Sequence, residues 1–282
     1  MKNLSLSRRE MLASSAAMSL AALAGPSISL ASTGTQKRVP GVQLYTVRAS
    51  LAKDVPGTLQ AIAGIGYQEV EFAGYGDQSV QQIRRLLDDL DLQSPSSHMD
   101  ARRLRENAAE LIELAAAIGH DYVTIAWLNP EDRQTIDDYK GWAETFNRVG
   151  EACRDSGMRL AYHNHDFEFE PLDGQLPFDV LLDETDADLV DFELDFFWVR
   201  KAGQDIVPVL NKAPERFTMA HIKDMDTQGE MADVGAGIID FADILGNEAA
   251  SGLRHLFVEH DQPADPFKSV AISRLALSSI LD

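Results

Sequence analysis

Apolar runs of strand length alternate with amphipathic stretches of helix length along residues 40–282. The amphipathic stretches repeat their apolar residues at helical spacing, and three of them end at Gly66, Gly119 and Gly157. The run QSPSSHM contains Pro95 and few apolar residues, so it is predicted to be a strand mainly from its place in the series. The eight predicted strands are residues 41–47, 67–74, 93–99, 121–128, 158–165, 189–196, 216–224 and 253–261. The eight predicted helices are residues 55–65, 79–92, 101–118, 136–155, 177–183, 205–212, 240–248 and 266–280.

Eight strand–helix pairs of this kind predict an α/β fold, a (β/α)8 TIM barrel that forms a single domain. An open, doubly wound sheet is the main alternative. No G-x-G-x-x-G motif follows the first predicted strand, so the sequence gives no support for a nucleotide-binding fold. The length of residues 32–282 matches the ~250 residues of one such barrel better than it matches two domains. We therefore expect a linker at residues 32–39 and the barrel at residues 40–282.

Residues 1–31 have the pattern of an export signal. Lys2, Arg8 and Arg9 precede an uncharged stretch of Ala, Leu, Met and Ser, and Ser29-Leu30-Ala31 offers small residues for cleavage. The run SRREML resembles the twin-arginine export signal of bacteria, with Met in place of the usual Phe. A retained membrane anchor is the alternative, although about 15 mildly apolar residues fall short of the ~20 needed to span a bilayer. We expect a periplasmic or secreted protein without a stable membrane anchor.

Acidic residues outnumber basic ones. The chain contains 45 Asp and Glu against 25 Lys and Arg, and its formal net charge is −20 at pH 7. The predicted signal carries three basic residues and one acidic residue, so its removal takes the net charge from −20 to −22. Because phosphate contacts need clustered Lys and Arg, this balance argues against binding to nucleic acid or to anionic membranes. Cys153 is the single cysteine, so an intrachain disulfide is excluded, and it is predicted to be a small packed residue in a helix.

Four predicted strands end in residues that can bind a metal ion. His163, Asp195, His221 and Glu259 stand near the ends of the runs RLAYHNH, DLVDFELD, FTMAHIKD and HLFVEH. Since the carboxyl ends of all strands in a parallel barrel meet on one face, these side chains are predicted to converge. Two His and two carboxylates there are enough to hold a divalent metal with room left for a substrate. The pattern predicts a metal-assisted enzyme that acts on a small polar molecule.

Other polar and aromatic residues are predicted to face the same mouth of the barrel. Side chains alternate along a strand, so His163 and His165 share one face, as do Glu193 and Asp195. Each of the other candidates has two possible roles. Glu71 and His98 either bind sugar hydroxyls or pack at the barrel rim, and Trp127 and Trp198 either stack on a sugar ring or pack in the core. Lys223 either binds a substrate oxygen or forms an ion pair with Asp224 or Glu259.

The chain resembles the sugar-phosphate isomerase/epimerase family, the xylose-isomerase-like barrels that also include endonuclease-IV-type enzymes. The motifs GVQLYTVR, YHNHDFEFE, LDFFWVRKAG, AHIKDMD and FVEHD carry this resemblance, which runs from Gly41 to Asp261. In that family a divalent metal is typically bound by a Glu on strand five, an Asp on strand six, a His on strand seven and a Glu on strand eight. Asp195, His221 and Glu259 match the last three positions.

Strand five departs from the family pattern. Many relatives carry Glu-Asn-His where this chain has His163-Asn164-His165, so an imidazole replaces an anionic ligand. A set of two His and two carboxylates suits Mn²⁺, Zn²⁺, Fe²⁺ or Co²⁺ better than Mg²⁺. The departure argues against a mechanism in which two symmetrically placed glutamates pass one proton across both faces of the substrate. It also leaves open whether the metal is weakly held or lost.

A site of this kind supports proton abstraction next to a carbonyl. A metal would polarise the oxygens of an α-hydroxy ketone or aldehyde, and a base would move the proton through an enediolate. His165 is the predicted base, with Glu259 or Glu168 as the carboxylate alternative. Gly235-Ala236-Gly237 is not followed by Arg or Lys, so it is predicted to be a substrate-side loop in which Asp240 caps the next helix. We therefore expect a non-phosphorylated sugar or keto-sugar as the small-molecule partner.

Two alternatives to a sugar isomerase or epimerase stay open. A lyase or hydratase acting on a 3-keto-glycoside would use the same carbonyl polarisation and then expel a β-substituent. A sugar-binding protein with a degenerate site is favoured by the departure at His163. The endonuclease branch fits poorly, because it uses more His ligands and its acidic substrate would be repelled. The exact sugar, the metal and the oligomeric state are left open.

Overall fold

Eight parallel strands close into a barrel in the order β1-β10-β7-β6-β5-β4-β3-β2 in the computed structural model, which describes residues 38–282. The predicted closed barrel is confirmed, including the strand predicted from the run QSPSSHM. The predicted export signal lies outside the described residues. The barrel strands are β1 (Pro40–Gln43), β2 (Glu69–Phe72), β3 (Gln93–Met99), β4 (Tyr122–Ile125), β5 (Arg159–His163), β6 (Val190–Asp195), β7 (Phe217–Ile222) and β10 (His255–Val258).

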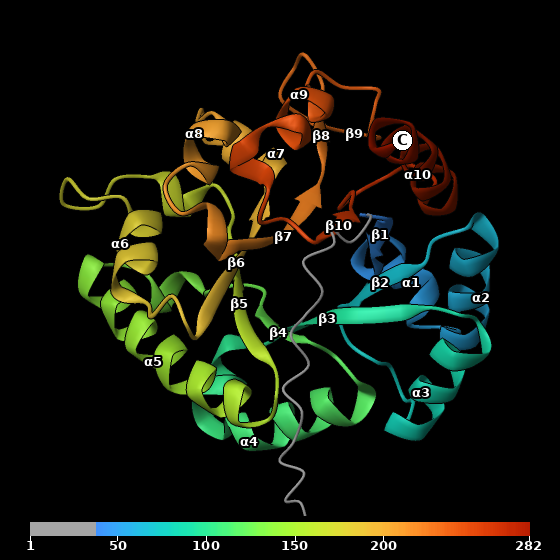
Figure 1. Cartoon of the computed structure of the whole chain (residues 1–282), viewed down its shortest axis with the longest axis horizontal. Coiled ribbons are helices and arrows are strands. Elements are labelled where there is room, and N and C mark those ends of the chain that lie inside the picture. The colour runs from blue at the N-terminus through green and yellow to red at the C-terminus, as the bar shows by residue number, and fades with distance from the viewer. Residues whose placement is uncertain (1–37) are drawn as a thin grey trace, which may run out of the picture. The chain divides into compact units, whose positions relative to one another are not determined.

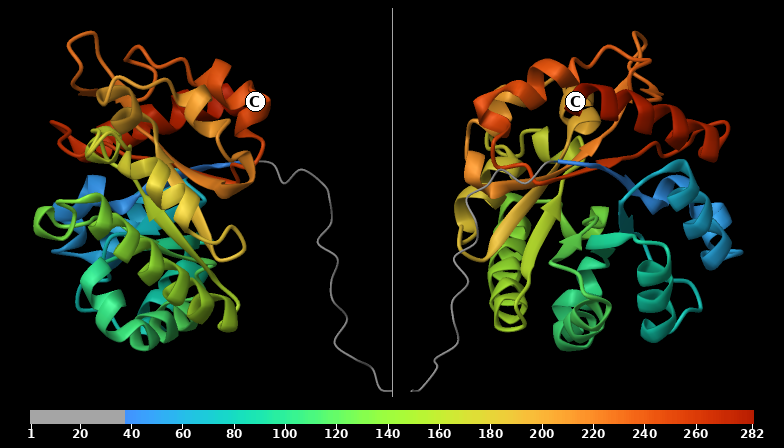
Figure 2. Two further views of the ribbon diagram at one scale, coloured as in Figure 1. Left: turned by 90° about the vertical axis from the view of Figure 1, so that its left-hand side faces the viewer. Right: turned by 45° about the vertical axis from the view of Figure 1, so that its right-hand side comes forward.

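Helices cover the outside of the barrel, as Figures 1 and 2 show from three directions. Of the helices in residues 38–282, none is both long and apolar enough to cross a membrane. The helices are α1 (Arg48–Leu51), α2 (Val55–Ile65), α3 (Val80–Asp89), α4 (Ala101–Ile118), α5 (Ile136–Asp155), α6 (Pro177–Glu184), α7 (Phe196–Lys201), α8 (Ile206–Leu210), α9 (Phe241–Gly246) and α10 (Pro266–Leu281).

Side-chain caps fix where the outer helices begin. Asp54, Ser79, Asp100 and Thr135 each accept a hydrogen bond from a backbone N–H in the first turn of α2, α3, α4 and α5. At the other end, α4 stops at Gly119, whose φ of 94° is in the left-handed region that favours glycine. These capping residues and the C-terminal glycine thus define helix ends locally along the chain.

Three differences between the observed and the predicted elements affect the mouth of the barrel. The first strand ends at Gln43, because the Gln43 side chain accepts a hydrogen bond from the Tyr45 N–H and turns the chain into the 3₁₀ helix η1 (Leu44–Val47). The additional helix α7 begins directly after β6, and a two-stranded hairpin of β8 (Asp224–Met225) and β9 (Met231–Ala232) follows β7. All three differences lie at the carboxyl end of the barrel, where they shape its mouth.

Inward-facing side chains form layers inside the barrel, since every second residue of a strand points inward. One layer is an apolar cluster of Tyr122, Ala161, Met219 and Phe257. Gly41 faces the same layer, because a Cβ at this position would lie 2.6 Å from a ring carbon of Phe257. The next layer toward the carboxyl ends is polar and fully buried, and the candidate site rests on it; it contains Gln43, Glu71, Ser96, Thr124, His163, Glu193 and His221.

Cys153 is a free, buried cysteine within α5. Burial raises the pKa of its thiol to about 12, so the thiolate that would be needed for nucleophilic chemistry is suppressed. The prediction that Cys153 is a packed residue is confirmed.

Candidate active site

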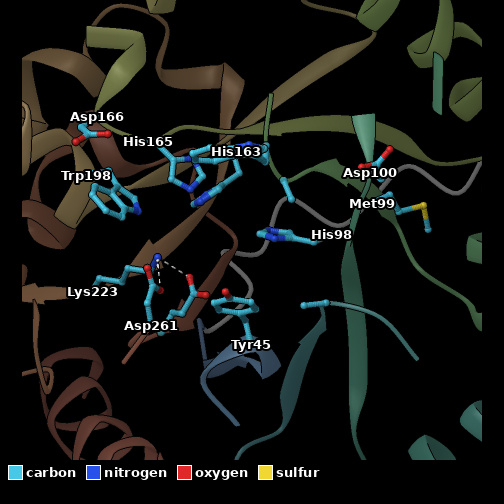
Figure 3. A pocket seen from close by; sticks show the side chains of 14 residues that line it. Tyr45, His98, Met99, Asp100, His163, His165, Asp166, Trp198, Lys223 and Asp261 are labelled. Atoms are coloured by element: carbon cyan, nitrogen blue, oxygen red, sulfur yellow. Dashed lines mark ion pairs between the residues drawn. The ribbon is translucent and has the colours of Figure 1, made fainter. Parts of the chain in front are cut away.

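A cavity of about 640 Å³ opens at the carboxyl ends of the barrel strands, where enzymes of this architecture place their sites (Figure 3). Of the predicted catalytic and metal-binding residues, His163, His165 and Glu259 line it. Of the predicted substrate contacts, His98, Trp127, Trp198 and Lys223 line it. The side chains of Asp195 and His221 are fully buried next to this lining.

Asp195, His221 and Glu259 form a group that can hold a metal ion. One ligand atom from each residue lies within 4.8 Å of the others. His221 Nδ1 is 2.8 Å from Glu259 Oε2 and 3.6 Å from Asp195 Oδ2. The Lys223 ammonium lies 3.0 Å from Asp195 Oδ2 and 2.8 Å from Glu259 Oε2, so both carboxylate oxygens already have a cationic neighbour. Buried carboxylates require positive charge nearby, and one imidazole with two carboxylates is a donor set that also suits a divalent cation.

Asp195 is held in place by its backbone and by its second carboxylate oxygen. Its N–H donates to the Asn164 side chain at 2.9 Å. Its Oδ1 accepts from the Trp198 N–H at 3.0 Å and thereby caps α7. Because Oδ1 is used for capping, Oδ2 is the oxygen that remains for the site.

His221 is oriented by a carboxylate behind it. Its Nε2 lies 2.8 Å from Glu71 Oε2 and 3.2 Å from Glu193 Oε2. A proton on Nε2 that is donated to Glu71 leaves the lone pair of Nδ1 for a metal, an arrangement typical of metal-binding histidines. Burial alone lowers the pKa of His221, but the carboxylates of Glu193 and Glu259 outweigh it and raise this pKa well above its usual value. The surroundings of the ring therefore attract positive charge.

His163 lies at the edge of this group and not inside it. Its Nε2 is 3.9 Å from Asp195 Oδ2, and its Nδ1 is 3.9 Å from Glu193 Oε2 and has no hydrogen-bond partner. His163 instead belongs to a second potential ligand group with His98, Glu193 and His221. Burial and the neighbouring His221 hold the pKa of His163 well below its usual value, so the ring is neutral and has a free lone pair. Three of the four predicted metal ligands thus converge, and the fourth lies next to them.

Lys223 places a positive charge beside the same carboxylates. Its Nζ is 3.0 Å from Asp195 Oδ2. It is also 2.8 Å from Glu259 Oε2 and 2.9 Å from Asp261 Oδ1, and dashed lines mark these two pairs in Figure 3. Burial alone lowers the pKa of Lys223, but these carboxylates raise it well above its usual value. The lysine is therefore an ammonium ion that lines the cavity. The predicted ion pair with Glu259 is confirmed.

The predicted alternative partner of Lys223, Asp224, faces the loop that follows the hairpin. Its carboxylate accepts hydrogen bonds from the backbone N–H groups of Gly235, Gly237 and Ile239 at 3.0, 2.9 and 3.1 Å, and from its neighbour Met225 at 2.8 Å. Backbone N–H groups that converge in this way form a binding site for an anion. In this chain, the protein's own carboxylate already fills that site. Asp240 caps α9 through the Asp243 N–H, as predicted.

Glu71 does not contact the cavity, which corrects the prediction that it binds sugar hydroxyls. It is fully buried, and its carboxylate accepts from Gln43 Nε2 at 2.7 Å and from the Ser96 hydroxyl at 2.5 Å. Burial, together with the nearby Glu193, raises the pKa of Glu71. This carboxylate supports His221 from below. His98 does reach the cavity, and its Nε2 is 2.8 Å from Glu193.

Glu168 also lies away from the cavity, which corrects its assignment as a catalytic carboxylate. The short 3₁₀ helix η3 (Phe167–Phe169) turns its side chain back toward β5. There it accepts from the Tyr162 hydroxyl at 2.5 Å and from the His165 N–H at 2.8 Å. Burial raises the pKa of Glu168 to about 7. The residue holds the backbone of the His163–His165 segment.

His165 is surrounded by aromatic rings on the cavity wall. Its ring centroid is 4.6 Å from that of Trp127, 5.5 Å from that of Phe167 and 5.4 Å from that of Trp198. Burial and the ammonium of Lys223 hold the pKa of His165 well below its usual value. A neutral imidazole that lines a substrate cavity can accept a proton, which is the role predicted for it.

Some residues of the site were not singled out from the sequence. Tyr45 and Asp261 line the cavity, and Gln43 binds the carboxylate that supports His221. Gln43 and Tyr45 lie in the motif GVQLYTVR and Asp261 ends the motif FVEHD, so the signal was present. Their roles depend on the turn into η1 and on the reach of Lys223, which an alternating pattern does not specify.

Known proteins resemble this chain in sequence and fold. A solved sugar phosphate isomerase/epimerase from Parabacteroides distasonis ATCC 8503 is 26% identical, with a TM-score of 0.76 over 90% of this chain and 98% of that one. The crystal structure of the IolI protein with a bound zinc atom shares the fold at 14% identity, with a TM-score of 0.69 over 86% of this chain and 98% of that one. An inosose dehydratase of Clostridium perfringens (strain ATCC 13124) is 32% identical over 89 residues, which are 32% of this chain.

The match to the dehydratase spans only 29% of that enzyme's own length. The model of the family described as xylose isomerase-like TIM barrel, in contrast, matches residues 59–269, which include every predicted site residue. The resemblance to sugar isomerases and epimerases is thereby confirmed, and the chain belongs to the xylose isomerase-like TIM barrel family.

Proposed function

We propose that this protein is a metal-dependent enzyme that moves a proton next to the carbonyl of a non-phosphorylated keto-sugar, and so isomerises or epimerises it. The observation that carries the proposal is the convergence of Asp195 Oδ2, His221 Nδ1 and Glu259 Oε2 within 4.8 Å of one another, beside a cavity lined by Lys223 and a neutral His165. Mn²⁺, Zn²⁺, Fe²⁺ or Co²⁺ suits this mixed donor set.

Each residue has a defined task in this proposal. A divalent metal bound by Asp195, His221 and Glu259 would polarise the carbonyl oxygen of the substrate. Lys223 provides an ammonium that can stabilise the negative charge developing on a substrate oxygen. His165 accepts the proton from the hydroxyl-bearing carbon next to the carbonyl and returns it to the former carbonyl carbon, while the hydroxyl proton moves to the former carbonyl oxygen, so that the carbonyl shifts by one carbon. Trp127 and Trp198 bracket His165 and limit the access of water to it.

The loop after the hairpin favours a substrate without a phosphate group. Its converging N–H groups are already bound to Asp224. Among the residues that line the cavity, Lys223 is the only Lys or Arg, and it is surrounded by Asp195, Glu259 and Asp261. A phosphate dianion would therefore find neither free backbone donors nor a surplus of positive charge.

Solvent deuterium exchange tests the proposal directly. In D₂O the metal-loaded protein is expected to introduce deuterium at the carbon next to the carbonyl of a keto-hexose, measured by NMR or mass spectrometry. His165→Asn is expected to reduce the exchange rate by roughly 100-fold or more, the usual contribution of a general base. His255→Asn is the matched control, because His255 pairs with Glu69 at the amino ends of the strands. Absence of exchange across a panel of keto-sugars would contradict the proposal.

Elimination is a second candidate function, supported by the similarity to inosose dehydratases. When a hydroxyl or glycosidic oxygen stands on the carbon β to the carbonyl, the same proton abstraction can expel it. The base takes the proton of the α carbon, and that C–H electron pair forms a carbon–carbon double bond. The β C–O bond breaks, its electrons leave with the oxygen, and a proton converts the leaving group to water or an alcohol. The reaction requires no oxidant or reductant.

We also propose that the protein is exported through its twin-arginine-type signal and acts in the periplasm or outside the cell. The basic residues, the uncharged stretch and the cleavage-site pattern of residues 1–31 support this proposal. Intact-mass analysis of protein recovered from the periplasm is expected to show an N-terminus at Ser32. Recovery of the uncleaved chain from the cytoplasm alone would contradict export.

The acidic balance of the chain supports a small-molecule partner over nucleic acid. Incubation with duplex DNA that contains an abasic site is expected to leave the DNA intact, as judged by gel electrophoresis. Metal-dependent nicking would instead assign the protein to the endonuclease branch.

A further inference from the structure

A second group of potential ligands lies beside the group that the proposed reaction uses. It consists of His98, His163, Glu193 and His221, whose ligand atoms lie within 4.8 Å of one another. Glu193 precedes Asp195 by two residues on β6, so its side chain lies one layer closer to the amino ends of the strands. The reaction proposed above gives no task to His98, His163 or Glu193.

Three atoms of this second group have the spacing of ligands around one ion. His98 Nε2 is 2.8 Å from Glu193 Oε2, and His163 Nδ1 is 3.9 Å from the same oxygen. The rings of His98 and His163 are neighbours on the cavity wall, with 5.2 Å between their centroids (Figure 3). Around Zn²⁺, bonds of about 2.0–2.2 Å place neighbouring ligand atoms roughly 3–3.5 Å apart. The two observed distances lie on either side of this range, so rotations of the side chains can bring all three atoms to one ion.

Two buried atoms of the same residues have no hydrogen-bond partner. They are His163 Nδ1 and Glu193 Oε1, on side chains that are 3% and 0% exposed. Burial and the neighbouring His221 hold the pKa of His163 well below its usual value, so its lone pair is available. Buried polar atoms normally have a partner, and a metal ion between His163 and Glu193 would provide one.

Glu193 also lacks a permanent positive charge beside it. Its ion-pair partners within residues 38–282 are His98, His163 and His221. The carboxylates of the first group differ, because the ammonium of Lys223 lies within 3.0 Å of them. A buried carboxylate requires compensating charge, and an imidazole supplies it only when it is protonated. A divalent ion would supply the charge while the imidazoles stay neutral.

We propose that His98, His163 and Glu193 form a second metal site, the inner site, which takes a divalent transition-metal ion in addition to the ion of the first group. Two imidazoles and one carboxylate are a donor set that suits Zn²⁺, Fe²⁺ or Co²⁺. His221 keeps its Nε2 proton for Glu71 and offers Nδ1 to the first ion, so the two sites share no ligand atom. The imidazole that replaces an anionic ligand on strand five thereby serves the inner site.

The inner ion borders the substrate cavity, because His98 and His163 both line it. Three protein ligands leave a coordination position open, and a substrate oxygen is the expected further ligand. Binding is expected to be weaker than at the first group for two reasons. The inner ion displaces the hydrogen bond between His98 and Glu193, and it is repelled by the first ion.

Equilibrium dialysis of the mature protein against increasing Zn²⁺ tests the inner site without relying on turnover. An excess of Mg²⁺ occupies the carboxylates of the acidic surface, and bound zinc is measured by mass spectrometry. Two zinc ions per chain are expected at saturation, of which one is retained after dialysis into zinc-free buffer. Binding of a single zinc ion at every concentration up to the millimolar range would overturn the proposal.

Substitutions then locate the second ion. His98→Asn and Glu193→Gln are each expected to abolish its binding and to retain the first ion. His255→Asn and Glu69→Gln are the matched controls. His255 Nδ1 is 2.9 Å from Glu69 Oε2 on side chains that are 13% and 6% exposed, and neither residue belongs to a group of three potential ligands in the described part of the chain.

Three results of these substitutions would also overturn the inner site. They are retention of the second ion in a folded His98→Asn or Glu193→Gln protein, its loss in both controls, and loss of both ions in both inner-site variants. Circular dichroism verifies that each variant is folded. Glu193→Gln preserves the size of the side chain and decides the question by itself if His98→Asn does not fold.

The inner site and the proposed function fail in different ways. A second zinc ion in a protein that exchanges no deuterium with any keto-sugar would support the inner site and contradict the proposed function. Deuterium exchange by a protein that binds a single ion would overturn the inner site and leave the proposed function standing.

Discussion

Replacement of Lys223 by methionine tests the electrostatics of the site most severely. The side chain is 3% exposed, and its ammonium contacts three carboxylates within 3.0 Å. Methionine has a similar length but no charge, so Lys223→Met leaves Asp195, Glu259 and Asp261 without this counter-ion. Breaking a buried ion pair by removing one partner costs about 3–5 kcal/mol, because the remaining charge is buried without compensation. We expect a loss of this size in the free energy of unfolding of the metal-free protein at pH 8.

The assay is equilibrium urea unfolding, supported by thermal melts. For a domain of this size, a loss of about 3–5 kcal/mol lowers the melting temperature by roughly 6–20 °C. Lys201→Met is the matched control, because the Lys201 Nζ is 3.4 Å from Glu230 in a pair with side chains that are 35% and 75% exposed. Such a surface pair contributes less than about 1 kcal/mol.

Added metal should reduce the loss caused by Lys223→Met, because a divalent ion restores positive charge among the same carboxylates. The increase in melting temperature on metal addition is therefore expected to be larger in the variant than in the unsubstituted protein. If Lys223→Met were no more destabilising than Lys201→Met, the ammonium would not be a buried partner of the three carboxylates, and the reasoning would be refuted.

Two further predictions concern residues that support the site. Asp224→Ala removes the acceptor of four backbone N–H groups, so the free energy of unfolding measured in urea is expected to fall by at least about 2 kcal/mol. A decrease below about 0.5 kcal/mol would mean that the loop does not depend on this carboxylate. Burial raises the pKa of Glu168 from 4.5 to about 7, so the folded protein binds more protons than the unfolded chain between these values and loses stability as the pH rises through them. This decline in the free energy of unfolding amounts to roughly 3 kcal/mol between pH 4.5 and 7. Glu168→Gln keeps an acceptor for the His165 N–H but cannot titrate, so it is expected to remove most of the decline. An unchanged pH dependence of unfolding in this variant would contradict the raised pKa.

The barrel could be predicted from the sequence because its signals are local and repeated. Apolar runs and amphipathic helices alternate eight times, and this regularity identified even QSPSSHM as β3. The helix α7 could not be predicted in the same way. The residues FFWV after Asp195 are all apolar and show no helical periodicity, and the change from strand to helix depends on the Asp195 side chain, which accepts a hydrogen bond from the Trp198 N–H.

The candidate site was predictable as a set of strand ends but not as a set of contacts. Alternation along β5, β6 and β7 correctly brought His163, Asp195 and His221 to the mouth of the barrel. It did not specify which imidazole nitrogen faces which carboxylate, so the position of His163 at the edge of the group, 3.9 Å from both Asp195 and Glu193, could not be foreseen. Glu168 was misassigned because η3 reverses the direction of its side chain, and that turn has no periodic signature.

Metal analysis tests the central claim, that Asp195, His221 and Glu259 hold a divalent ion, most directly. The mature protein is purified without a metal-binding tag, and its metal content is measured by inductively coupled plasma mass spectrometry before and after incubation with Mn²⁺, Zn²⁺, Fe²⁺ and Co²⁺. We predict one tightly bound ion per chain, lost in His221→Asn and Glu259→Gln and retained in His255→Asn and Glu69→Gln, which alter the equivalent pair at the opposite end of the barrel. A protein that takes up no metal, or equal loss of metal in all four variants, would contradict the account.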